Sequence, residues 1–582
     1  MTEPVEAERV TAPVARSTGT RLLWVRRNVP TVVMLLIAGV LVVPPVIMLF
    51  VSALTSVDAD GTSTFNFDNF VGILTNPVTY QTLGNTLVFS ISASLLTTIL
   101  ATGLAWLVER TNAPLRRTVY VLMILSFAVP TFVQGMGWML FLGPNNGVVT
   151  SVSRLLFGDG APAFPLYTMG SMIGIQALTL LPAIFLLIAP VVRSANPAHE
   201  EAAAVSGASR TQVMRRVTLP LMLPGVGAAL FLSFIIAVDA FEVPALVGTP
   251  SRIVVLSTEI YSKVRTAFPD YETASAFAIL LMLLTIVGLN FYQRSTASAQ
   301  KFATVTGKGF RAAQMDLGGW RWLGGAICLV ISLLVIAPVL MVVWASLLRT
   351  YEAPSATALS QVSLDTYVRV FENTSVTEAL LNSLLLGLAC AIVTVVLTGS
   401  AAWFLVRRRS LATRGVDLLL TLPLVIPGIV LSLAMLRTYI SVPLPIYGTQ
   451  AIVLIALVIH YAPYGMRYAH AGMVSLHTEL EEAALVSGAS RFTVARRILL
   501  PLLLPSLFAA SAFIFLATIR QLSLVLFLAG PGNQLAAPLM FRLWGQGSLP
   551  EASALAVIVV VAACALLLIA NRLTAGKAIQ GG

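Results

Sequence analysis

A 25-residue stretch occurs twice in this chain, and this duplication constrains the fold more than any other feature of the sequence. Residues 200–224 and 481–505 are identical at eighteen of 25 positions, at a fixed offset of 281 and without a gap. Two unrelated loops have no reason to match so closely, so the chain contains two copies of one structural unit. Each copy is predicted to form two short helices around a turn, followed by a proline-marked entry into an apolar run.

The residues of the duplicated stretch predict its local structure. Gly207 and Gly488 suit the left-handed position that ends a first helix. The segments Thr478–Glu481 and Ser209–Gln212 each have the spacing of a capping box, in which two side chains satisfy free amides at a helix start.

The rest of the chain is too apolar for a soluble protein. It is 57% hydrophobic and only 10% charged, with a mean hydropathy of +0.89, whereas soluble domains carry about 25% charged residues. We therefore predict an all-α integral membrane protein with two parallel repeats of six transmembrane helices. The twelve expected spans are 31–54, 82–108, 118–142, 168–192, 222–247, 273–293, 323–348, 379–405, 415–438, 449–474, 503–529 and 552–571.

These spans divide the chain into two halves with short polar segments around them. The expected parts are a tail over 1–30, a first half over 31–293 (core about 82–293, loop 196–220), a linker over 294–322, a second half over 323–571 (core about 379–571, loop 477–501) and a tail over 572–582.

The repeat extends beyond the duplicated loop. Asn85-Thr86 and Asn382-Ser383 open matching second spans at an offset of 297, and Pro130 and Pro427 keep that offset in the third. Six spans are an even number, so both halves share one orientation and are related by an axis along the membrane normal.

Basic residues predict the orientation. If the amino terminus is cytoplasmic, segments on that side carry 26 of the 36 basic residues, as the positive-inside rule requires. Both termini and both duplicated loops are then cytoplasmic, in a bacterial cytoplasmic membrane. The net charge of +11 is therefore a topology signal, and membrane lipid, not nucleic acid, is the expected partner.

The duplicated loops resemble the "EAA" loop of ATP-binding-cassette (ABC) importer permeases of the type I, binding-protein-dependent class. The pattern of Glu-Ala-Ala, a later glycine and a proline-bearing apolar entry is met by 201–203, Gly207 and Pro220, and by 482–484, Gly488 and Pro501. In that family the loop docks into a groove on the ATPase subunit. The resemblance implies two copies of a cytoplasmic ABC ATPase and an extracytoplasmic substrate-binding protein as partners. The coupling residues it implies are Glu200, Glu201, Ala202, Ala203, Gly207 and Arg210, and Glu481, Glu482, Ala483, Ala484, Gly488 and Arg491.

The chain lacks the residues for nucleotide or metal chemistry. Gly307-Lys308 and Gly576-Lys577 lack the earlier glycine of a phosphate-binding loop. We therefore expect no enzyme activity, no catalytic residue and no bound cofactor here, with ATP and Mg²⁺ on the partner ATPase. The three cysteines lie within apolar runs, and no metal-ligand spacing is found.

Polar residues within spans are candidates for the substrate path, because burying them in a bilayer is costly. Asp239 and Glu242 lie in the fifth predicted span, and Arg520 and Gln521 in the eleventh. Asp239 and Arg520 are equivalent at the offset of 281, so we hypothesise that they pair across the pore axis as a gate or a substrate-contact layer. A purely structural role is the alternative.

The substrate is suggested by resemblance alone. Asp239 to Gly248 and Arg520 to Leu526 are similar to segments that follow the loops in ferric-iron permeases, although that branch often has Glu where this chain has Gln521. Ferric iron is the expected substrate, with thiamine, polyamine, phosphonate, sulfate or molybdate as alternatives. A secondary transporter driven by an ion gradient is an alternative of another class.

Overall fold

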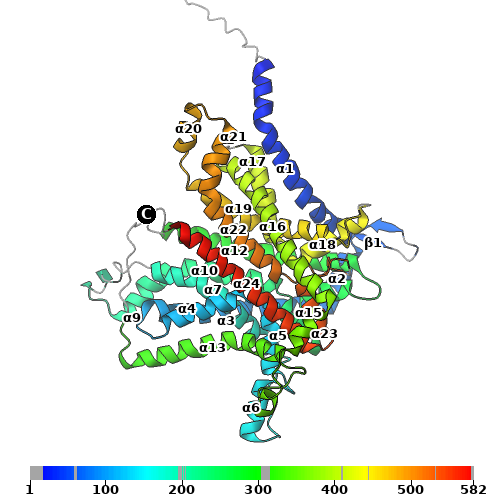
Figure 1. Ribbon diagram of the computed structural model, residues 1–582, viewed down its shortest axis with the longest axis vertical. Coiled ribbons are helices and arrows are strands. Elements are labelled where there is room, and N and C mark those ends of the chain that lie inside the picture. Colours follow the sequence, from blue (N-terminus) through cyan, green and yellow to red (C-terminus); the bar gives the residue numbers. More distant parts are fainter. Residues whose placement is uncertain are drawn as a thin grey trace, which may run out of the picture.

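The computed structural model describes most of the chain, and Figure 1 shows it as a bundle of helices. The described residues are 18–57, 60, 62–194, 200, 202–203, 205–302, 315–407, 410–442, 445–530 and 532–578. Most of the predicted tails, the centre of the predicted linker and Glu201 lie outside them.

The described part of the first half consists of long helices joined by short helices and one strand pair. They are α1 (Thr18–Ala53), β1 (Thr55–Val57), β2 (Ser63–Phe65), α2 (Asp68–Thr75), α3 (Pro77–Arg110), α4 (Arg116–Ala128), α5 (Thr131–Leu142), α6 (Val148–Phe157), α7 (Met169–Ser194), α9 (Arg210–Val213), α10 (Leu219–Asp239), α11 (Leu256–Val264) and α12 (Tyr271–Phe302). The antiparallel pair β1–β2 is the one sheet among the described residues.

The second half repeats this order. Its helices are α13 (Arg321–Ser346), α14 (Ala356–Leu359), α15 (Asp365–Glu372), α16 (Thr374–Arg407), α17 (Leu411–Thr421), α18 (Gly428–Ser441), α19 (Gln450–Val474), α20 (Glu479–Val486), α21 (Arg491–Val494), α22 (Leu500–Arg520), α23 (Ala536–Gly545) and α24 (Leu549–Ala578). Short π-helices, Met214–Thr218 and Ala495–Leu499, precede α10 and α22.

The all-helical membrane fold is confirmed. Within the described residues nine helices are long and apolar enough to span a bilayer, or up to eleven if each of two bent helix pairs is one span. The last predicted span falls in α24, where Leu549–Ala565 is an apolar helix within the part whose side chains are described. Twelve spans therefore stay a prediction.

The sequence predicted continuous helices for the third and ninth spans, but both helices are broken. α4 and α5 meet at 107°, and the helical segments on either side of Pro427 meet at 111°. Val129 and Ile426, which precede Pro130 and Pro427, are extended, with ψ of 134° and 109°. A proline disfavours helical backbone in the residue before it and donates no amide of its own, so each helix ends there.

The fifth and eleventh helices are also shorter than predicted. The sequence placed their ends near residues 247 and 529, but α10 ends at Asp239 and α22 at Arg520. Ala240 and Gln521 leave the helical conformation, with ψ of 126° and 119°. A charged residue is therefore the last residue of each of these two helices.

The first helix of each half packs against the other half. α1 lies along α17 and α18 as well as α12, and α13 lies along α4 and α5. Met34 and Ala38 of α1 share a buried cluster with Val416 and Leu420 of α17. This exchange interlocks the two repeats, because neither can separate without pulling a helix out of its partner.

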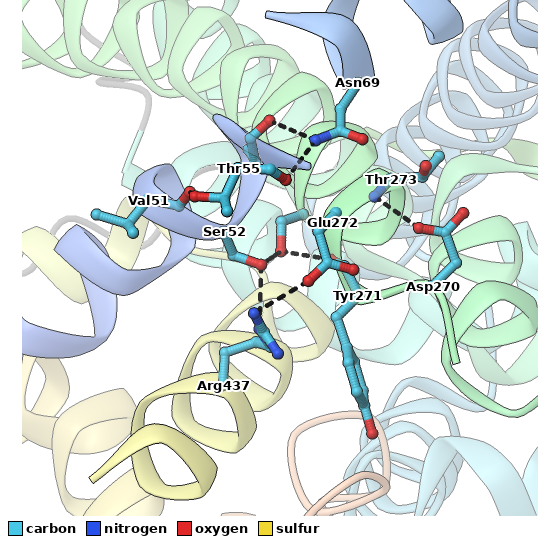
Figure 2. A network of polar contacts seen from close by, with 11 residues as sticks. Val51, Ser52, Thr55, Asn69, Asp270, Tyr271, Glu272, Thr273 and Arg437 are labelled. Carbon is cyan, nitrogen blue, oxygen red and sulfur yellow. Dashed lines mark hydrogen bonds and ion pairs between the residues drawn. The ribbon is translucent and has the colours of Figure 1, made fainter. Parts of the chain in front are cut away.

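A polar network fixes the end of α1 between the halves (Figure 2). Arg437 of α18 donates to Glu272 of α12 over 3.1 Å and to the Ser52 hydroxyl of α1 over 3.1 Å. Ser275 of α12 donates to the same hydroxyl over 3.0 Å. Asn69 binds the Ala53 and Thr55 carbonyls, which ties the β1 segment to α2.

Two short helices expose matching apolar faces. α2 and its equivalent α15 directly precede the long helices α3 and α16. Phe67, Val71 and Leu74 are 63%, 56% and 50% exposed. Their equivalents at the offset of 297, Leu364, Val368 and Phe371, are 67%, 55% and 56% exposed. The spacing of four and three residues gives one apolar stripe, as in helices that lie in a membrane surface.

The exchange of α13 depends on a glycine. A Cβ at Gly137 of α5 would overlap the Pro338 carbonyl of α13, and such overpacking costs about 1–3 kcal/mol. We expect Gly137→Ala to lower the melting temperature of the purified protein by several degrees. Gly174→Ala is the control, because its Cβ would meet nothing within 4 Å and alanine favours a helix. Equal melting temperatures for the two variants would contradict this packing.

Candidate functional site

The described residues of the two duplicated loops have matching backbone geometry at the glycine. Gly207 and Gly488 have φ of 85° and 86°, the left-handed conformation that the sequence predicted. Behind each glycine, Ala208 N–H donates to the Ala203 carbonyl and Ala489 N–H to the Ala484 carbonyl, both over 3.0 Å. Both loops then continue through a short α-helix and a π-helix into the long helices α10 and α22.

One predicted capping box forms and the other does not. Ser209 N–H donates to the Gln212 side chain over 2.8 Å, and Gln212 N–H donates back to the Ser209 hydroxyl over 3.4 Å. Thr478 makes no side-chain cap, so the predicted Thr478–Glu481 box is wrong. Glu481 has a stronger partner, because a charged guanidinium competes with a neutral amide.

That partner is an arginine in each half. Arg407, the last residue of α16, donates to Glu481 over 2.6 Å and to the Leu476 carbonyl over 3.1 Å. Arg110, the last residue of α3, pairs with Glu200. Glu200 also accepts from the Thr218 hydroxyl over 2.7 Å. The first glutamate of each loop therefore points into the protein and fixes the loop to the end of a long helix.

Sequence reasoning did not select these arginines, although the signal was present. Arg110 and Arg407 are equivalent at the offset of 297, and Glu200 and Glu481 at 281. The offset between the two halves changes from 297 to 281 between the arginine and the glutamate of each pair. The two pairs can therefore be recognised as equivalent only when both offsets are used.

Several of the other predicted loop residues face outward. Ala202, Glu482 and Ala483 are exposed, whereas Ala203 and Ala484 are half-buried. Val205 and Val486 are equivalent and are 90% and 89% exposed, which is unusual for valine beside a folded bundle. Arg210 and Arg491 open α9 and α21, but their side chains lie outside the described part. Each loop thus presents an exposed apolar side chain near its glycine.

Among the described residues, one cluster of ion pairs lies in the first half and has no counterpart in the second. Glu109 is almost fully buried and accepts from Arg193 over 2.9 Å, from Arg116 over 2.7 Å and from the Tyr120 hydroxyl. It joins the ends of α3, α4 and α7. The equivalent position in the second half is Val406, so this cluster is not part of the repeat.

The in-span charges bind helix ends rather than each other. Asp239 accepts from the Gly428 amide, the first residue of α18, over 2.9 Å. Arg520 donates to the Phe127 carbonyl, near the end of α4, over 2.6 Å. The described ion pairs include none between Asp239 and Arg520, so the hypothesised pair does not form there. The signs fit the helix dipole, with the anion at an amino end and the cation at a carboxyl end.

Glu242 and Gln521 complete this central layer. Glu242 lies close to Thr131, the first residue of α5, and interacts electrostatically with Arg520. Gln521 accepts from the Tyr461 hydroxyl over 3.2 Å and lies against Ser523. All four predicted residues therefore meet at the two broken spans. Within the described residues, no group of three or more His, Cys, Asp or Glu side chains could hold a metal ion.

The comparison with known families decides the class of this protein. Residues 99–299 and 383–576, more than half of the chain, match the family described as "Binding-protein-dependent transport system inner membrane component". The chain belongs to this family of importer permeases. The two matched ranges fall in the two halves, each with one duplicated loop, so the permease contains two family units in one chain.

Relatives of this permease span most of its length. A "Putative ferric transport system permease protein FbpB 1" of Haemophilus influenzae is 26% identical over 494 residues, covering 84% of this chain and 75% of that protein. A "Ferric transport system permease protein FbpB" of Actinobacillus pleuropneumoniae is 25% identical over 534 residues, covering 90% and 75%. A "Sulfate transport system permease protein CysT" of Salmonella typhimurium is 27% identical over 237 residues, covering 40% of this chain and 82% of that protein.

The loop anchor of the permease is testable without its partners. Arg407→Gln removes the contacts to Glu481 and Leu476, which should destabilise α20 by about 1–2 kcal/mol. We expect backbone amides of α20 to exchange hydrogen roughly tenfold faster, measured by mass spectrometry in lipid nanodiscs. The control is Arg414→Gln on α17, an exposed side chain. Unchanged exchange in α20 would mean that the pair does not hold the loop.

Proposed function

We propose that this permease imports ferric iron, driven by two copies of a cytoplasmic ABC ATPase and supplied by an extracytoplasmic binding protein. The iron assignment is supported by the ferric transport permeases that align with most of the chain. The binding protein is supported by the family description. In this proposal the chain holds no nucleotide, and ATP and Mg²⁺ bind to the ATPase.

The observation that carries the ATPase partner is the matched construction of the two loops. Each loop has an exposed valine, a left-handed glycine and an inward glutamate held by an arginine. In Figure 1 the two loops stand well apart, near α9 and near α20 and α21. Two similar docking surfaces suit two identical ATPase subunits. Since this family imports, the loops and both termini are cytoplasmic in this proposal.

The contacts suggest how loop movement reaches the centre of the membrane. Glu200 is joined to α3 through Arg110 and to the start of α10 through Thr218. α10 ends at Asp239, which binds the first amide of α18 in the other half. A displaced loop would therefore move α3 and α10 together and pull on the broken ninth span. Neither step needs covalent chemistry by this chain.

Sulfate is the alternative substrate that a comparison favours. The sulfate relative aligns with 40% of this chain, less than half of the share covered by the ferric relatives. It fits one half of the permease rather than the fused whole. Iron is therefore the better-supported substrate, while an ion-driven secondary transporter is disfavoured by the family assignment.

The importer proposal predicts stimulated ATP hydrolysis. We expect the permease–ATPase complex in nanodiscs to hydrolyse ATP several-fold faster with the iron-loaded binding protein. Gly207→Val with Gly488→Val should abolish most of this stimulation, because valine is strained by roughly 1–2 kcal/mol at each left-handed position.

The control is Gly158→Val, which also places valine at a positive φ, 86°, but on the loop after α6. It should keep the stimulation. Stimulation by a sulfate-loaded binding protein instead would exclude iron as the substrate but support the importer assignment. If no ATPase binds to the permease, the proposal fails.

The central layer is predicted to hold the path closed in the resting state. Asp239→Asn keeps the shape but removes the charge from the α18 amino end, a loss of about 0.3–1 kcal/mol. We expect faster ATP hydrolysis without binding protein, and the same direction for Arg520→Gln. The control is Asp365→Asn on the exposed start of α15. Asp239→Asn with wild-type hydrolysis and transport would leave these residues a structural role alone.

A further inference from the structure

A cavity of about 510 Å³ lies between the two halves, beside α11 and its equivalent α23. We call it the α11–α23 cavity. Its polar lining residues are Tyr261, Arg265, Tyr447, Gln534 and Arg542. Among the described residues, its lining includes no aspartate or glutamate. A cavity of this size accommodates a small molecule or a hydrated ion complex.

The two arginines come from opposite halves. Arg265 directly follows α11, and Arg542 lies in the last turn of α23. Both side chains are exposed. Arg542 donates to the Gln534 side chain over 3.4 Å. Among the described ion pairs, none involves either arginine. Two guanidinium groups therefore face the cavity without a neutralising carboxylate.

One wall of the cavity is aromatic. Tyr261 stacks on Phe527 with ring centroids 6.0 Å apart, and Phe541 meets it edge-on at 6.0 Å. Phe241 packs against Tyr261 and Phe541 at 5.1 and 5.9 Å. Phe241 directly precedes Glu242 in the chain, so these aromatic rings adjoin the central layer. Molecules in the cavity contact the two arginines and no carboxylate of the described residues.

We propose that the α11–α23 cavity is an entry site for an anion. Arginine binds carboxylate and phosphate oxygens through paired hydrogen bonds. A bare trivalent cation would instead be repelled by both guanidinium groups. Resting on the proposed function, this means that iron enters the permease as an anionic complex with oxygen ligands and not as free Fe³⁺.

The test measures binding to the permease–ATPase complex in nanodiscs without the binding protein. Radiolabelled ferric citrate is the probe, with unlabelled citrate, inorganic phosphate and sulfate as competitors. We expect saturable binding that excess citrate displaces and that weakens with salt. Arg265→Gln with Arg542→Gln should weaken it at least tenfold, while Arg265→Lys with Arg542→Lys should retain part of it.

Lys263→Gln is the matched control, because Lys263 lies on α11, pairs with Glu259 and does not line the cavity. It should bind the probe as the unaltered complex does. Equal binding by the double Gln variant, or no binding by the unaltered complex, would overturn the site. Binding of radiolabelled sulfate by a complex that does not bind ferric citrate would keep an anion site but overturn the iron complex.

The same preparation separates this inference from the importer proposal. If the iron-loaded binding protein stimulates ATP hydrolysis but the complex does not bind the anion, only the entry-site proposal is excluded. If hydrolysis is not stimulated but the anion binds, the iron-importer proposal is excluded and the anion site is retained.

Discussion

Backbone groups freed by a broken helix need partners wherever water is absent, and this requirement organises the centre of the permease. In a bilayer an unsatisfied amide or carbonyl costs several kcal/mol. Pro130 and Pro427 end helices inside two predicted spans, which leaves free helix ends at the bundle centre. The amide of Gly428 is satisfied by Asp239, and the carbonyl of Phe127 by Arg520.

These two contacts also join the halves. Asp239 belongs to the first half and binds the second, whereas Arg520 belongs to the second and binds the first. The exchanged helices α1 and α13 add an apolar connection of the same kind. The Arg437 network, with Glu272 and Ser52, adds a polar one at the end of α1. The halves are thus held together at several depths, while the duplicated loops stand apart (Figure 1).

The sequence predicts the repeat, the helical membrane fold and the left-handed glycines, because each follows from local pattern. Gly207 and Gly488 are such a case, since few residues other than glycine tolerate their backbone. The sequence also marks Pro130 and Pro427 as equivalent, yet apolarity alone does not distinguish a straight span from one bent by over 100°. The partners of Asp239, Arg520 and Glu481 could not be predicted, because they depend on how distant helices pack.

Joining two repeats in one chain permits an arrangement that a homodimer cannot have. Asp239 and Arg520 occupy equivalent positions with opposite charge. Two identical subunits would place either two acids or two bases there, and only one kind of helix end would be matched. Gene duplication followed by divergence removes that restriction, since each copy can mutate independently. The Glu109 cluster is a second case of this divergence, since the equivalent residue in the second half is Val406. The opposite charges of Asp239 and Arg520 at the centre of the permease are therefore possible because the two halves are no longer identical.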